Sequence, residues 1–338
     1  MFLPSDKIIE CVPNVSEGNS GKIIDEIKAA ILSVEGVALL NVDPNKSANR
    51  TVFTFAGFPN SVIEAAFRLI KTAAELIDMS KHTGKHPRIG ATDVCPIIPI
   101  SNISMDEVNV YALNLAKRVG DELSIPIYCY ENSSILEYRK HLEQIRQGEY
   151  ENFFQKIILP EWKPDFGSEN FNYKTGATVI GARNFLIAYN VNLKTQSVEI
   201  AKKIAENVRE SGKWGKDTEG NVINVPGKFK NLKAIGWYIS DFNKVQVSMN
   251  ITDYKLTPIL SVYETIKQEA KTFGTDVEGS ELIGLIPRDA LIEAGLALSK
   301  GEKLSNRQLI EKAAGYLGLS SVKRFDEHQN ILENLLGI

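Results

Sequence analysis

The apolar positions of the first hundred residues follow two different periods. Residues 21–34 and 60–79 carry apolar side chains at helical spacing, as in GKIIDEIKAAILSV. The segments around them are short apolar runs bounded by turn residues, a pattern typical of strands. These predicted strands cover residues 8–15, 37–43, 50–57 and 92–100. The predicted order of elements is therefore βαββαβ.

The same order returns after residue 183. Strands are predicted at 185–193, 232–240, 245–252 and 280–287, and helices at 197–210 and 258–274. Two βαββαβ units predict an α+β fold with two ferredoxin-like subdomains, an internal duplication. We place the subdomains at residues 1–180 and 181–338. In each, the helices cover one face of an antiparallel sheet and leave the other face for a different partner.

Several segments lie outside the two repeats. We predict helices at 104–123 and 134–147, a strand at 125–131, an irregular connector at 159–183 and an exposed loop at 214–231. The last forty residues predict two or three helices, a C-terminal helical extension of the second subdomain.

Composition and charge narrow the class of partner. The net charge is −3 with both signs interspersed, so neither nucleic acid nor a membrane is expected as a partner, and small molecules are. The three cysteines lie far apart, which predicts neither a disulfide framework nor a thiolate metal site. No export signal or long apolar run is evident, and we expect a cytoplasmic protein.

Two of the four histidines, His82 and His86, stand in one turn-rich loop, MSKHTGKHPRIGATD. Their spacing suits zinc binding on a helix, but Gly84 and Pro87 disrupt a helix and no carboxylate lies between them, so we expect no metal. Both could be solvated loop residues. One could instead be a general acid and base, because imidazole titrates near neutral pH. The residues alone favour neither histidine.

Other polar side chains follow or precede the predicted strands. Asp43 ends one strand, in a stretch that could equally be a plain turn, and Asn14 ends another. Arg50, Arg88 and Arg183 are candidates for binding substrate carboxylates, although arginines also serve as ordinary surface residues. No G-x-G-x-x-G or P-loop motif occurs at a strand-to-helix turn, so no nucleotide is expected.

Seven blocks of sequence together resemble one family. They follow one another in this order, and the resemblance covers essentially residues 9–290: ECVPNVSEG, NVDPNKSANRTVFTFAG, LIDMSKHTGKHPRIGATDVCPIIP, PDFG, GATVIGARNFLIAYNVNL, AIGWYI and GSELIGLIP. The chain resembles the glutamate formimidoyltransferases. The resemblance implies two ferredoxin-like subdomains with folate between them, tetrahydrofolate as co-substrate, no metal or nucleotide, and a homodimer.

The resemblance also implies roles for individual residues. The family's catalytic histidine lies in its H-P-R-[MI]-G segment and corresponds to His86, so His82 is expected to shape the loop or bind substrate. The aspartate of the family's strand-end motif corresponds to Asp43, which we expect to orient the imidazole of His86. The folate-binding segment corresponds to Gly167, Ser168, Glu169, Asn170, Phe171, Asn172, Tyr173, Lys174, Thr175 and Gly176. Its interior departs from the more serine- and proline-rich loop of known relatives.

The implied reaction transfers the formimino group from N-formimino-L-glutamate to tetrahydrofolate, a step of histidine degradation and one-carbon metabolism. His86 would act first as base and then as acid. Two alternatives stay open: formyl transfer between 5-formyltetrahydrofolate and glutamate in the same site, and a folate-binding protein without turnover. Some relatives carry a cyclodeaminase domain, for which the residues after 290 are too few, so we expect a separate cyclodeaminase.

Overall fold

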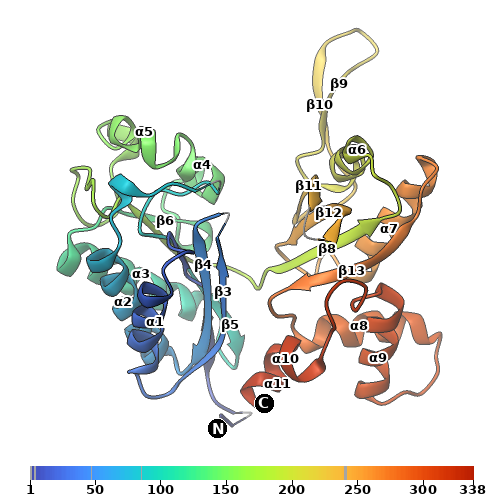
Figure 1. Ribbon diagram of the computed structural model, residues 1–338, viewed down its shortest axis with the longest axis horizontal. Helices are drawn as coiled ribbons and strands as arrows, with labels where there is room; N and C mark the ends of the chain where they lie inside the picture. The colour runs from blue at the N-terminus through green and yellow to red at the C-terminus, as the bar shows by residue number, and fades with distance from the viewer. Residues whose placement is uncertain (1, 4, 47, 85, 240–241) are drawn as a thin grey trace. The chain divides into compact units, whose positions relative to one another are not determined.

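The computed structural model describes residues 2–3, 5–46, 48–84, 86–239 and 242–338. It divides into two compact units, Met1–Asn184 and Phe185–Ile338, each with its own hydrophobic core (Figure 1). Both units contain the predicted βαββαβ order, which confirms the α+β class and the internal duplication. Within the described ranges, no helix combines the length and the apolar character that a membrane crossing requires.

The first unit is built on a seven-stranded sheet. Its strands are β1 (Ile8–Cys11), β2 (Asn14–Val15), β3 (Val37–Asn45), β4 (Arg50–Gly57), β5 (Thr92–Ser101), β6 (Ile127–Cys129) and β7 (Thr178–Ala182). β1 and β2 are two parts of one predicted strand, interrupted around Pro13. They lie between β4 and β5, and β3 pairs with the outer side of β4. The antiparallel part thus has the strand order of a ferredoxin-like fold.

Three helices pack on one face of this sheet and form the main core with it (Figure 1). They are α1 (Gly21–Leu32), α2 (Pro59–Leu76) and α3 (Met105–Leu123). Polar side chains fix two of the helix starts: Ser20 accepts a hydrogen bond from the Ile23 N–H, and Ser104 forms a capping box with Glu107. α2 instead begins with Pro59, which needs no amide partner there.

The prediction of a connector over residues 159–183 is wrong for its last part. Thr178–Ala182 forms β7, which lies between β5 and β6 and runs parallel to both. All five residues are buried, because α3 covers one face and a second core around Tyr128 and Phe153 covers the other. A strand covered on both faces shows no alternation of apolar and polar residues.

Short helices build the region next to that second core. They are η1 (Met79–Lys81), η2 (Glu131–Ser133), η3 (Glu137–Arg139), α4 (Leu142–Arg146), α5 (Glu149–Lys156) and η4 (Pro160–Trp162). The helix predicted at 134–147 is therefore broken into η3 and α4.

The second unit repeats the same topology with four antiparallel strands. They are β8 (Ile187–Leu193), β11 (Leu232–Ile239), β12 (Lys244–Ile251) and β13 (Val277–Ile283), in the order β11-β12-β8-β13. Helices α6 (Val198–Val208) and α7 (Ile259–Thr272) complete its core. Gly236 allows α6 to approach closely, because a Cβ there would lie 2.1 Å from the Lys202 nitrogen.

Two further pieces extend the second unit. The loop predicted at 214–231 contains an exposed hairpin of β9 (Lys213–Lys216) and β10 (Val222–Val225), which projects from the unit (Figure 1). Helix α8 (Arg288–Ser299) precedes the last forty residues. Within them, the predicted helical extension consists of α9 (Asn306–Leu317), α10 (Glu327–Asn330) and α11 (Leu332–Leu336). Ala313 and Leu317 of α9 are buried in the core of this unit.

Candidate active site

The loop that carries both histidines connects η1 to β5 and lies against the turn before β4. Gly84 permits this approach, because a Cβ there would lie 2.3 Å from the Ala48 carbonyl oxygen. The Asn49 side chain donates to the Thr83 carbonyl oxygen at 2.9 Å, which fastens loop and turn together. The loop is therefore held beside the N-terminal end of β4, whose first residue is Arg50.

His82 uses both of its ring nitrogens within the protein. Nε2 lies 2.9 Å from the Asn49 carbonyl oxygen, which can only accept, and Nδ1 accepts from Arg88 Nε at 3.2 Å. These bonds fix His82 as a neutral imidazole with its hydrogen on Nε2, and burial lowers its pKa. With no nitrogen left for a reactant, His82 has the contacts of a residue that shapes the loop.

His86 is bonded differently. Its Nδ1 lies 2.8 Å from the Pro87 carbonyl oxygen and 3.2 Å from Nη1 of Arg50. The two contacts favour opposite tautomers, because Nη1 of Arg50 can only donate and the Pro87 carbonyl oxygen can only accept. The contact to the carbonyl is the shorter, and on that ground we assign the hydrogen to Nδ1. Nε2 then carries the lone pair, and no described residue bonds to it. Burial, and next the charge of Arg50, lower the pKa of His86 to about 4. The imidazole is thus neutral at pH 7 and can accept a proton at Nε2.

A buried carboxylate organises the surroundings of His86. Asp93, fully buried near the start of β5, accepts from Arg50 Nη1 at 2.7 Å, from the Ile89 N–H at 3.0 Å, and from Arg146 through both Nε and Nη2. Burial would raise the pKa of Asp93, but Arg146 and Arg50 hold it below its usual range. Arg50 also donates to Asn14 Oδ1 through Nε and Nη2. Asp93 is therefore a charged link between β4, β5 and α4.

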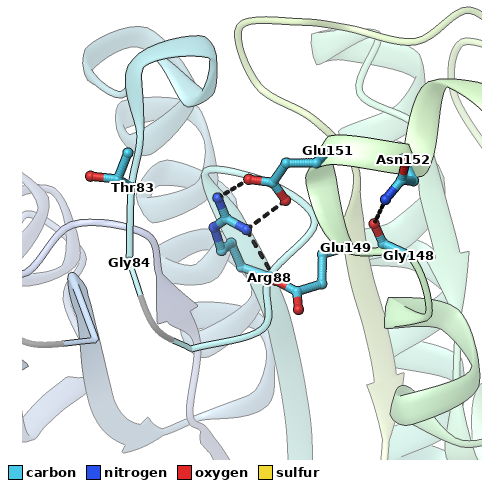
Figure 2. Close-up of a pocket in the computed structure, with 7 residues that line it drawn as sticks. All are labelled: Thr83, Gly84, Arg88, Gly148, Glu149, Glu151 and Asn152. Atoms are coloured by element: carbon cyan, nitrogen blue, oxygen red, sulfur yellow. Dashed lines mark hydrogen bonds and ion pairs between the residues drawn. The ribbon is translucent and has the colours of Figure 1, made fainter.

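Arg88 belongs to a separate cluster on the other side of the loop. Figure 2 shows its guanidinium paired with the carboxylates of Glu149 and Glu151. The N–O distances are 3.2 Å to Glu149 and 2.5 to 2.8 Å to Glu151. A pocket of about 430 Å³ opens beside it, lined also by Thr83, Gly84, Gly148 and Asn152. Arg88 thus clamps the histidine loop to the start of α5.

The structure brings some of the predicted site residues together and leaves others apart. Arg50 touches His86 directly. Asp43 is exposed on β3, and no hydrogen bond or ion pair joins it to His86 within the described residues. Arg183 follows the last residue of β7, where its N–H bonds to the Ile97 carbonyl oxygen, at the end of the strand away from the histidine loop. Its role and that of Asp43 stay predictions.

The predicted folate segment, Gly167–Gly176, borders the histidine loop. The Met79 N–H bonds to the Lys174 carbonyl oxygen, the Ala91 N–H bonds to the Thr175 carbonyl oxygen, and Gly90 pairs with Gly176. Inside the segment, Asn172 Oδ1 accepts from the N–H groups of Lys174 and Thr175. The segment and the loop of His86 therefore form one continuous structure.

Replacing Gly176 by alanine should loosen this junction. Gly176 has φ +65°, and a Cβ there would lie 2.1 Å from the Ile89 carbonyl oxygen, so the backbone must move. We expect a loss of about 1–3 kcal/mol in the free energy of unfolding, together with weaker folate binding. Urea unfolding and a folate titration measure both effects. Gly220→Ala, at φ +88° in the hairpin loop with no atom near its Cβ, is the control and should leave folate binding unchanged.

Two site residues are not evident from the sequence patterns. Asp93 and Arg146 stand near His86, since their charges act on its pKa, and neither belongs to a recognised motif. A charged residue inside an otherwise apolar predicted strand, TDVCPIIPI, is the signal that could have revealed Asp93, because buried charges are nearly always paired. No comparable signal marks Arg146. Among the described residues, no group of three or more His, Cys, Asp or Glu side chains is arranged to bind a metal.

Fold and site define a duplicated α+β protein with a neutral histidine whose Nε2 has no hydrogen-bond partner among the described residues. Family models described as "Formiminotransferase domain, N-terminal subdomain" and "Formiminotransferase domain" match residues 8–183 and 188–337. The chain belongs to the formiminotransferase family, which confirms the resemblance seen in the sequence.

Curated relatives agree with this assignment. The chain is 41% identical over 332 residues to the glutamate formimidoyltransferase of Streptococcus pyogenes serotype M1, covering 98% of this chain and 99% of the relative. It is 42% identical over 288 residues to that of Thermoplasma acidophilum, covering 85% and 90%. It is also 44% identical over 338 residues to the formimidoyltransferase-cyclodeaminase of Dictyostelium discoideum, covering 98% of this chain but spanning only 60% of that relative's length.

Proposed function

We propose that this protein transfers the formimino group from N-formimino-L-glutamate to N5 of tetrahydrofolate and releases L-glutamate. The observation that carries the proposal is His86, a neutral imidazole whose Nε2 is bonded by no residue that the structure describes, in a chain of the formiminotransferase family. Relatives that match nearly full length are named glutamate formimidoyltransferase, which supports the choice of donor.

The proposed mechanism uses one histidine twice. N5 of tetrahydrofolate attacks the formimino carbon and forms a tetrahedral intermediate whose N5 is cationic and acidic. Nε2 of His86 takes the N5 proton and returns it to the glutamate nitrogen, after which the bond between that nitrogen and the formimino carbon breaks. The net change moves one proton from N5 to the glutamate nitrogen. A weak base suffices, because the proton it removes comes from a cationic nitrogen.

The segment Gly167–Gly176 is our proposal for the folate site. Phe171 is anchored against Tyr150 and Phe153, with ring centroids 5.4 and 6.3 Å apart. Tyr173 packs edge-on against Phe171 and is 64% exposed, so its ring offers an aromatic surface to a flat ligand. Because the segment adjoins the histidine loop, folate bound there would lie close to His86.

The reaction rate should depend on the protonation of His86, in a pH range that is unusually low for a histidine. His86 must be neutral to act as base, so activity is present above its pKa and lost as the pH falls through it. For the free enzyme we expect the acid limb of kcat/KM near pH 4, well below the usual histidine value of about 6.5. Steady-state rates between pH 3.5 and 8, with circular dichroism at each pH to verify folding, test this expectation. An acid limb at pH 6.5 or above in a folded protein would contradict it.

The proposed activity is tested by offering purified protein tetrahydrofolate with N-formimino-L-glutamate. In a parallel reaction, L-glutamate is offered with 5-formyltetrahydrofolate. We expect 5-formiminotetrahydrofolate and glutamate from the first pair at a rate far above that of the second. A faster second reaction would move the assignment to formyl transfer, and tight folate binding without either reaction would indicate a binding protein.

We further propose that a cyclodeaminase consumes the product. Several relatives, in Dictyostelium discoideum and Rattus norvegicus among others, are named formimidoyltransferase-cyclodeaminase, and this chain spans 60% of their length.

A further inference from the structure

Two arginine clusters flank the loop of His86, and their charges differ. In the first, Arg88 meets two carboxylates, those of Glu149 and Glu151 (Figure 2). In the second, two arginines, Arg50 and Arg146, share the single carboxylate of Asp93. The first cluster therefore has one excess negative charge, and the second has one excess positive charge. Only the second is suited to an anion.

Arg146 also keeps hydrogen-bond donors for a further acceptor. Its Nε and Nη2 contact Asp93, while no described residue bonds to its Nη1. The side chains of Arg146 and Arg50 are 14% and 12% exposed, so both are mostly buried but still accessible. An unbalanced positive charge in such surroundings is unfavourable, and a carboxylate that pairs with it is bound more strongly than at an exposed arginine.

We propose that Arg146, together with Arg50, binds the α-carboxylate of the amino-acid donor beside His86. This inference rests on the proposed function, since it names the part of the donor that the site holds. From the sequence, three arginines are candidates for binding carboxylates. Of these, Arg50 takes part, Arg88 is already paired with two glutamates, and Arg183 lies at the other end of β7.

The α-carboxylate fits better than the γ-carboxylate because of its place in the donor. A single carbon separates the α-carboxylate from the nitrogen that must be protonated, whereas three carbons separate the γ-carboxylate from it. Nη1 of Arg50 lies 3.2 Å from Nδ1 of His86. A carboxylate held on this pair of arginines therefore brings the reacting nitrogen close to the imidazole, and restricts its position.

Donor binding would also activate the base. Among the described residues, the charged groups that act on His86 are Arg50 from β4, Arg146 from α4 and Asp93 from β5. After burial, the two arginines lower the pKa of His86, and Asp93 offsets them in part. A donor carboxylate adds the missing negative charge, so the pKa of His86 rises when the donor is bound. His86 becomes a stronger base only when a reactant is present.

The first test replaces Arg146 by glutamine. We expect KM for the donor to rise about 10- to 100-fold, which is the range of one charge-assisted interaction, while KM for tetrahydrofolate stays unchanged. Arg146→Lys should recover part of the loss. Arg118→Gln, which removes an arginine that bridges Glu64 and Glu122 on the outer helices, is the matched control and should leave both constants unchanged. Urea unfolding verifies that each variant is folded.

The second test pairs each enzyme with altered donors, the α-carboxamide and the γ-carboxamide of N-formimino-L-glutamate. The α-carboxamide should lose about 10- to 100-fold in kcat/KM with the wild type, and little further with Arg146→Gln, because the same interaction is already absent. The γ-carboxamide should affect both enzymes equally. In the wild type, the acid limb of kcat should lie at higher pH than that of kcat/KM, since kcat reports the donor complex. In Arg146→Gln the acid limbs of kcat and kcat/KM should lie closer together. A purely structural role of Arg146 would leave their separation unchanged.

Three results would overturn the inference: an unchanged donor KM in folded Arg146→Gln, equal losses with the α-carboxamide in both enzymes, or acid limbs of kcat and kcat/KM that coincide in the wild type. If the wild type shows no turnover, the proposed function fails first. Calorimetric titration with L-glutamate then tests the carboxylate site independently of turnover. Binding that weakens at least 10-fold in Arg146→Gln supports the carboxylate site, and equal or absent binding in both proteins overturns it.

Discussion

Replacing His86 by alanine should lower kcat by about 10²- to 10⁴-fold, the usual contribution of a positioned general acid and base. At pH 7 the imidazole of His86 is neutral, and its Nε2 has no hydrogen-bond partner among the described residues. Its removal leaves substrate positioning in place, so slow turnover should remain. Steady-state kinetics with N-formimino-L-glutamate and tetrahydrofolate, together with a folate titration, measure the effect.

The control for this variant is His328→Ala, which removes an exposed histidine of the second unit. It should keep wild-type kcat. A folded His86→Ala protein with wild-type kcat would exclude His86 from the chemistry. A loss of folate binding as large as the loss of kcat would instead give His86 a binding role.

The second large effect concerns stability. Asp93→Asn removes the carboxylate that Arg50 and Arg146 share, and leaves two mostly buried guanidinium groups without a counter-charge. Breaking a buried ion pair from one side costs about 3–5 kcal/mol, and we expect the free energy of unfolding to fall by that amount at pH 7. Urea unfolding of both proteins at pH 7 measures the difference.

The pH dependence of the free energy of unfolding distinguishes the loss of this ion pair from a simple loss of packing. The folded pKa of Asp93 lies below its unfolded value, so its stabilisation is present above the unfolded pKa and is lost as the pH falls through the folded one. The gap between wild type and Asp93→Asn should therefore shrink in acid. Asp121→Asn, which breaks an exposed pair with Lys117, should cost less than about 1 kcal/mol. A pH-independent gap would contradict the electrostatic account.

The architecture was largely predictable because each repeat follows simple periods. Helices such as α2 show an apolar stripe at helical spacing, and the half-buried strands lie between clear turn signals. The prediction failed where burial removes the pattern. β7 is covered on both faces and contains Gly181, so its sequence reads as part of a connector. The hairpin β9–β10 has the converse difficulty: all of its strand residues except Gly215 are exposed, so no buried face imposes an alternation of apolar and polar positions.

The site was predictable only in part, since its contacts join residues distant in sequence. The motif around His86 was informative, but the two histidines differ in their hydrogen-bond partners. Asn49 and Arg88 bond to both ring nitrogens of His82, whereas Nε2 of His86 has no partner among the described residues. Asp93 meets Arg50 across 43 positions and Arg146 across 53. No local pattern reports such pairings, because folding alone brings these side chains together.

The measurement that tests the central claim most directly is an NMR titration of the ring nitrogens of the four histidines in the substrate-free protein. His86→Ala identifies the signal of His86. We predict a neutral ring at pH 7, with hydrogen on Nδ1, whose pKa lies near 4. A pKa of 6.5 or above, or a hydrogen on Nε2 in the neutral form, would contradict the claim that His86 is held ready as the base of this reaction.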